Sequence, residues 1–334
     1  MQLSTGSCQR RQLPVESYEW IEHNKHEDRV TVSITSDKVK SELSKSKTLT
    51  KSNDNKDPVE PVPVLIIETP KGLLSINWAD IWRYRELLYF LTWRDVKVRY
   101  KQTVLGALWA ILQPFLTMVV FTLFFGKLAG LGKKTGGIPY PIYTYAALLP
   151  WTFFANSLTT SGNSVVGSSN LVTKVYFPRL IIPIAAVGAG LVDFAVSSVV
   201  LIGMMIYYGT PLTWHLALAP LFLIGVILVA TGVGSLLSAL TVAYRDFRYV
   251  VPFLVQMWMF ATPVIYPTNI VPLRWRWVLS INPMAGLIDG FRSVFLGSSF
   301  DWPHITISLA VCVAAFLIGA SYFRAVERRF ADII

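Results

Sequence analysis

The chain has 334 residues, of which 53% are hydrophobic and 15% are charged, and its mean hydropathy is +0.48. Soluble domains carry about 25% charged residues. Here the apolar residues gather in runs of about 20, enough for a helix to cross a hydrocarbon layer about 30 Å thick. This composition excludes an ordinary soluble protein and predicts an all-α integral membrane protein.

The net charge of +10 is unevenly distributed. Residues 1–60 contain ten basic and ten acidic side chains, so the whole excess of Lys and Arg lies in the rest of the chain. Most of these cations flank the apolar runs, where they meet phospholipid headgroups. They form no continuous patch with interleaved aromatic residues, so we expect membrane lipids and no nucleic acid as partners.

The first 103 residues divide into two parts. Residues 1–60 are polar and cannot bury enough apolar surface to offset chain entropy, which predicts a disordered cytoplasmic extension. Residues 61–103 form a linker and a segment, 80–102, in which aromatic and aliphatic residues alternate with cations. That mixture is too charged for a spanning helix and predicts an amphipathic helix in the headgroup plane. Its last cations are candidate lipid-headgroup contacts: Arg94, Lys97, Arg99 and Lys101.

Residues 104–334 contain six candidate spans. Membrane helices tolerate the prolines inside them when neighbouring groups satisfy the freed carbonyls. The predicted spans are 104–126, 141–161, 181–208, 214–242, 249–267 and 304–323. Lys and Arg are more frequent on the side of the 80–102 segment, which predicts cytoplasmic N- and C-termini.

The stretch between the fifth and sixth spans contains a second apolar segment about half a membrane long. Asn282-Pro283 is a plausible helix start, so we expect short re-entrant or exit helices here. The ionisable candidates in this segment are Asp289 and Arg292.

The chain offers little of the chemistry that enzymes and ion-driven carriers use. The string GLGKKTGG at 130–137 lacks the spacing of a phosphate-binding loop. Asp193 is the one intramembrane acid, and either a functional role or a hydrogen bond to a neighbouring helix explains it. The spans are too poor in charge for a metal site, and Cys8 and Cys312 are expected to be unpaired. We therefore expect no catalytic residue, metal or cofactor in this chain.

Aromatic residues are abundant in the second and fifth spans. They suit a carbohydrate conduit, because sugar rings stack on aromatic faces, and they equally suit lipid-facing belts. The candidates are Trp151, Phe153, Phe154, Trp258, Phe260 and Tyr266.

Several strings, in order, carry a resemblance to a known family. They are RELLYFLTWRDVKVRYKQTVLGALWAILQP (85–114), NLVTKVYFPRLIIP (170–183), YRDFR (244–248), TPVIYP (262–267) and NPMAGLIDGFRSVFLG (282–297). Over about residues 62–334 the chain resembles the permease subunits of type-2 ABC exporters, in the branch that exports O-antigen, capsular polysaccharide or teichoic acid. Residues 1–60 have no counterpart in this resemblance.

The resemblance implies a homodimer in the inner membrane with two separate ABC ATPase subunits, which would bind ATP and Mg²⁺. The pore would lie between the protomers and take a lipid-linked glycan such as an O-antigen. The short helices at 282–299, including Asn282, would line or gate the exit. The cations of the 80–102 segment would hold the pyrophosphate of the lipid carrier, although plain anchoring to anionic lipids explains them equally well.

The resemblance also assigns the loop after the second span to contact with the ATPase. Its helix would present Val172, Val175, Tyr176 and Phe177 as apolar contacts, while Lys174 and Arg179 would meet acidic groups of the ATPase. Pro178 would end the helix. Two alternative functions stay open: a small-lipid or drug exporter of the same superfamily, and a membrane transferase that acts on lipid-linked sugars.

Overall fold

The computed structural model describes residues 78–101, 106, 108–210, 213–327 and 330. The chain divides into two units, Met1–Glu68 and Thr69–Ile334, and all described residues belong to the second. The prediction for 1–60, and the linker up to residue 77, lie outside the described residues. Every regular element within these ranges is helical, as the sequence predicted.

Two helices precede the predicted spans. They are α2 (Trp78–Arg83) and α3 (Arg85–Lys101), and they adjoin at Tyr84. Tyr89, Phe90 and Trp93 of α3 are exposed, and the Lys97 ammonium lies 5.6 Å from the Trp93 ring centre. The helical prediction for this segment is confirmed, while its position in the headgroup plane stays a prediction.

A helix occurs in each of the six predicted spans. They are α4 (Leu108–Phe121), α5 (Tyr140–Gly167), α7 (Ile181–Tyr208), α8 (Ala219–Ala243), α9 (Phe247–Ala261) and α12 (Trp302–Glu327). The π-helix η1 (Thr122–Leu128) continues α4, and the 3-10 helix η3 (Trp214–Leu218) precedes α8.

Four of these helical segments, among the described residues, are long and apolar enough to cross a membrane: 108–128, 181–208, 214–243 and 302–327. The Thr, Ser and Asn side chains of α5 lower its hydropathy, and α9 has only 15 residues. The predicted fifth span, 249–267, was too long, because Pro263 and Pro267 cannot continue the helix that ends at Ala261. The count of six spans therefore stays a prediction.

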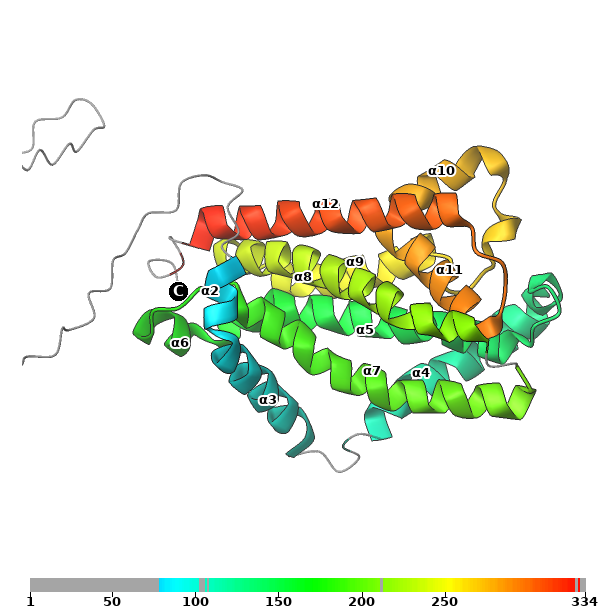
Figure 1. Cartoon of the computed structure of the whole chain (residues 1–334), viewed down its shortest axis with the longest axis horizontal. Helices are drawn as coiled ribbons and strands as arrows, with labels where there is room; N and C mark the ends of the chain where they lie inside the picture. Colours follow the sequence, from blue (N-terminus) through cyan, green and yellow to red (C-terminus); the bar gives the residue numbers. More distant parts are fainter. Residues whose placement is uncertain (1–77, 102–105, 107, 211–212, 328–329, 331–334) are drawn as a thin grey trace, which may run out of the picture. The chain divides into compact units, whose positions relative to one another are not determined.

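Short helices occupy both ends of the long ones (Figure 1). At one end lies α6 (Ser169–Lys174), and at the other lie α10 (Leu273–Ile281) and α11 (Pro283–Leu296). The side chain of Asn282 accepts a hydrogen bond from the Met284 N–H, which confirms Asn282-Pro283 as a helix start. The 3-10 helices η2 (Leu131–Lys134) and η4 (Thr268–Ile270) lie in the connections.

The core surrounds α5, which packs against α7, α8 and α11. A larger apolar cluster takes in the middle of α5 together with α8 and α11. A smaller one gathers residues of α3, α6, α8 and α12 at the α6 end, with Leu91 and Phe323 among them. The structure thus has one core along its length and a second beneath α6.

The packing of α8 on α12 depends on two glycines. A Cβ atom on Gly319 would lie 1.9 Å from the Gly232 carbonyl oxygen, and one on Gly232 would lie 2.4 Å from the Phe316 Cα. Both obstacles are backbone atoms, which cannot rotate away. Small residues allow this close approach, which is how membrane helices gain packing energy without a hydrophobic driving force.

We expect Gly319→Ala to lower the free energy of unfolding by about 1–3 kcal/mol, because α8 and α12 must separate to admit the methyl group. Gly203→Ala in α7 is the matched control, since a Cβ there meets nothing within 4 Å. Thermal unfolding in detergent measures both. Equal stability of the two variants would contradict the close crossing.

Candidate functional site

A cavity of about 660 Å³ lies between α3, α4, α5 and α7. It is lined by Arg99 and Tyr100 of α3, Trp109 and Gln113 of α4, and residues of α5 and α7 that include Asp193. The Ser197 hydroxyl donates a 2.8 Å hydrogen bond to the Ala110 carbonyl and so joins α7 to α4 beside the cavity. Segments far apart in the sequence therefore build one site.

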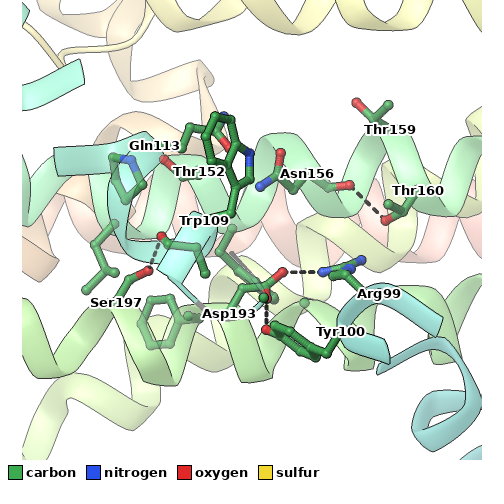
Figure 2. A pocket seen from close by; sticks show the side chains of 17 residues that line it. Arg99, Tyr100, Trp109, Gln113, Thr152, Asn156, Thr159, Thr160, Asp193 and Ser197 are labelled. Carbon is green, nitrogen blue, oxygen red and sulfur yellow. Dashed lines mark hydrogen bonds and ion pairs between the residues drawn. The ribbon is translucent and has the colours of Figure 1, made fainter. Parts of the chain in front are cut away.

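Asp193 forms the charged part of this cavity. Figure 2 shows Arg99 and Tyr100 pointing toward its carboxylate. The Arg99 guanidinium pairs with Oδ2, and the Tyr100 hydroxyl donates to Oδ1. Burial, together with the nearby Asp193 carboxylate, raises the pKa of Tyr100 to about 12. The sequence alone left the role of Asp193 open, and the structure shows it held by two partners on α3.

One face of α5 forms the neutral polar wall of the cavity. Thr152, Asn156 and Thr160 recur every four residues, the spacing of one helical face, and Thr159 lies beside them. The Thr160 hydroxyl donates to the Asn156 carbonyl at 2.8 Å. The residues of this face are not among the candidates predicted from the sequence. The periodicity of polar residues along 152–160 is the signal that predicts it.

Aromatic side chains contribute the apolar part. Trp109 and Phe153 line the cavity, and Phe153 stands edge-on to Phe194 with ring centres 5.7 Å apart. A mostly apolar recess with a few placed polar groups is typical of ligand sites, whose volumes run from about 300 to 1,000 Å³.

The other predicted aromatic residues have different surroundings. Trp151 and Phe154 are buried, and Phe154 packs edge-on against Trp258 with ring centres 5.1 Å apart. The Trp258 indole N–H donates to the Asn282 side chain at 3.0 Å. Phe260 is 49% exposed and Tyr266 is partly buried. Phe153 is the member of the predicted set that lines the 660 Å³ cavity.

The four predicted headgroup cations do not gather at one point. Arg94 pairs with Asp95 at 2.8 Å, and Lys97 lies over the Trp93 ring. Arg99 reaches into the cavity and Lys101 is exposed. The sequence predicted one group of headgroup contacts, but in the structure the four cations have different neighbours.

The predicted ATPase-contact segment divides into an inward and an outward set. Val172 and Phe177, 3% and 5% exposed, belong to the cluster beneath α6. Val175 and Tyr176 are 51% and 77% exposed, and Lys174 is also exposed. The resemblance implies that Val172 and Phe177 project outward as apolar contacts, but both pack inward.

Two further details of this segment differ from expectation. α6 ends at Lys174, because Val175 adopts an extended backbone, so Pro178 does not end it. The resemblance implies an acidic partner for Arg179 on the ATPase, but its guanidinium donates to the Glu327 carbonyl at the end of α12. Arg179 therefore ties this segment to α12.

Two of the predicted exit residues, Asp289 and Arg292, form a network at the α10–α11 end. Arg292 is 2% exposed and donates to the carbonyls of Pro263 at 2.7 Å and Val264 at 2.6 Å. Asp289 lies 3.4 Å from Arg292 and accepts a hydrogen bond from the Thr268 hydroxyl. Burial raises the pKa of Asp289, and the Arg292 guanidinium opposes that rise. Arg292 thus satisfies the carbonyls that follow α9.

Among the described residues, no group of three or more His, Cys, Asp or Glu side chains is placed to hold a metal ion.

Comparison with known proteins gives consistent matches. The ABC-2 type transporter family matches residues 86–296. The O-antigen export system permease protein RfbA of Myxococcus xanthus is 30% identical over 259 residues, which cover 76% of this chain and 98% of that protein. The RfbA protein of Klebsiella pneumoniae is 29% identical over 251 residues, covering 75% and 95%. The polysialic acid transport protein KpsM of Escherichia coli is 20% identical over 249 residues, covering 70% and 91%.

A double-mutant cycle tests the pairing in the cavity. We expect Arg99→Gln and Asp193→Asn each to lower the free energy of unfolding, and the double variant to lower it by less than their sum. The side chains are 30% and 20% exposed, so solvent screening reduces the coupling to about 1 kcal/mol. Thermal unfolding of all four proteins in one detergent measures it, and additive losses would contradict a direct pair.

Proposed function

The chain belongs to the ABC-2 type transporter family, and on that premise we propose that it is the permease subunit of an ATP-driven exporter of a lipid-linked polysaccharide. Its pore would lie between two copies of the chain, and two separate ATPase subunits would supply the energy. The relatives named for O-antigen export and polysialic acid transport support a glycan as the cargo.

The mixed lining of the 660 Å³ cavity carries this proposal. Sugar rings present hydroxyl groups at their edges and apolar C–H groups on their faces. The α5 wall supplies amide and hydroxyl oxygens, and Trp109 and Phe153 supply aromatic faces. Because Asp193 is paired with Arg99, the cavity exposes no isolated charge at that point. This chemistry fits a neutral polar chain better than an ion or a purely apolar molecule.

The outward set at the α6 end supports docking of an ATPase there. Tyr176 and Val175 expose apolar surface beside the cation Lys174, while Phe177 packs into the cluster that also contains residues of α3 and α12. A movement of the ATPase against Tyr176 would therefore be transmitted through packed side chains to α3, which lines the cavity, and to α12. α10 and α11 occupy the opposite end (Figure 1).

The cavity wall gives the first test. In membranes or proteoliposomes that contain the chain and its ATPase, we expect lipid-linked glycan to stimulate ATP hydrolysis. Thr160→Val together with Asn156→Leu should reduce that stimulation about tenfold, because the wall loses two of its polar groups.

Thr117→Val is the matched control, since Thr117 lies on α4 and its hydroxyl donates to the Gln113 carbonyl at 2.8 Å. Stimulation by a small lipid or drug but not by glycan would favour the small-lipid or drug exporter. Glycosyl transfer by the chain without an ATPase would favour the transferase.

The outward set gives the second test. Tyr176→Ala should reduce ATP-driven export several-fold with little change in thermal stability, because its side chain is 77% exposed. Phe177→Ala should instead lower the free energy of unfolding by about 3–5 kcal/mol, as expected for a buried aromatic residue. Tyr89→Ala on α3, where Tyr89 is 70% exposed, is the control for loss of an exposed tyrosine. Normal export by the Tyr176 variant would remove this segment from the coupling.

A further inference from the structure

A second recess, a groove of about 540 Å³, runs along α7 and the α4–η1 segment. Phe115, Val119 and Leu123 recur every fourth residue on one wall, and Val200, Met204 and Tyr208 repeat the same spacing on the other. Each wall is thus one continuous face of a helix. The groove between them follows the helices and is not a closed chamber.

The groove occupies the last turns of both spans. The α7 wall extends from Val200 to Tyr208, where α7 ends, and the other wall extends to Lys127, next to the end of η1. Eight residue steps of α-helix cover about 12 Å. One leaflet of a hydrocarbon layer about 30 Å thick is about 15 Å deep. The groove therefore has about the depth of a single leaflet, and the ends of α7 and η1 would place its mouth at the headgroup level.

Charge and polarity are concentrated at that mouth. Lys127 is exposed there, and its long apolar stem lets the ammonium reach the phosphate layer. Tyr207, 83% exposed, lies at the same end, where tyrosines favour the membrane boundary. Deeper in the groove, the Thr122 hydroxyl donates to the Met118 carbonyl at 2.7 Å. The interior is thus apolar and the mouth is cationic.

We propose that this groove binds one acyl chain of an anionic phospholipid, with the lipid phosphate at Lys127. A bilayer lipid combines an apolar chain of one-leaflet length with a negative headgroup at its end, and the groove is complementary to both. This site is separate from the 660 Å³ cavity. Its test does not depend on the identity of the exported molecule.

Gly203 offers a way to block the groove. It lines the α7 wall, and a Cβ there meets nothing within 4 Å, so a larger side chain can start from this position without a clash at its Cβ and would project into the groove. Native mass spectrometry of the delipidated full chain, titrated with dioleoyl phosphatidylglycerol, gives the apparent Kd. We expect Gly203→Phe to raise this Kd about tenfold and Lys127→Gln to raise it about fivefold, the weight of one cation at an anionic surface.

Matched controls separate the site from general effects. Gly167→Phe also adds a ring in open space, at the end of α5, and Lys133→Gln removes another exposed lysine, on η2. Both should bind phosphatidylglycerol as the unmodified chain does. Lys127→Gln should raise the Kd for dioleoyl phosphatidylcholine by less than it raises the Kd for phosphatidylglycerol, because the choline cation offsets the phosphate charge. Unfolding temperatures verify that the variants fold.

Three outcomes would overturn the proposal. Unchanged phosphatidylglycerol binding by Gly203→Phe would remove the groove as a lipid site. A changed oligomeric state with unchanged lipid binding would show that a second copy of the chain covers the groove. Equal weakening for both lipids by Lys127→Gln would remove the preference for an anionic headgroup.

Discussion

A carboxylate in the middle of an apolar helix must be paired inside the protein, and this constraint organises the cavity. An acid at the centre of a membrane helix costs about 2.5–3.5 kcal/mol on insertion scales. Asp193 meets the requirement with Arg99 and Tyr100, both of which come from α3. Since α3 precedes the predicted spans, this pairing places its end against the middle of α7. The cavity between α3, α4, α5 and α7 forms beside that contact.

The same requirement applies at the α10–α11 end. The prolines after α9 end its helical hydrogen bonding, and Arg292 donates to the carbonyls of Pro263 and Val264. Asp289, close to Arg292, partly balances the buried cation. The structure therefore has two charged clusters, one at the cavity and one at the α10–α11 end, and the polar wall of α5 is uncharged. This distribution supports a conduit for polar, uncharged cargo within the proposed exporter.

Signals from residues close together in the sequence were sufficient to predict the helices and some of the residues at which they begin or end. Apolar runs predicted a helix in every candidate span, and Asn282-Pro283 predicted the start of α11, because a side-chain cap and a proline act within one turn. The fifth span was drawn too long, since its apolar residues continue past Pro263 although the helix does not. Pro178 was predicted to end α6, but α6 already ends at Lys174.

By itself, the sequence determined the membrane class, the helices and the strings that match the exporter family, because these depend on composition and on neighbours within a few residues. Only the tertiary structure decided that Asp193 pairs with α3, that Phe177 packs inward while Tyr176 points outward, and that Thr152, Asn156 and Thr160 line a cavity. Each of these facts depends on contacts between residues far apart in the chain. The order of residues along a helix states which side chains share a face, but only helix packing determines what that face meets.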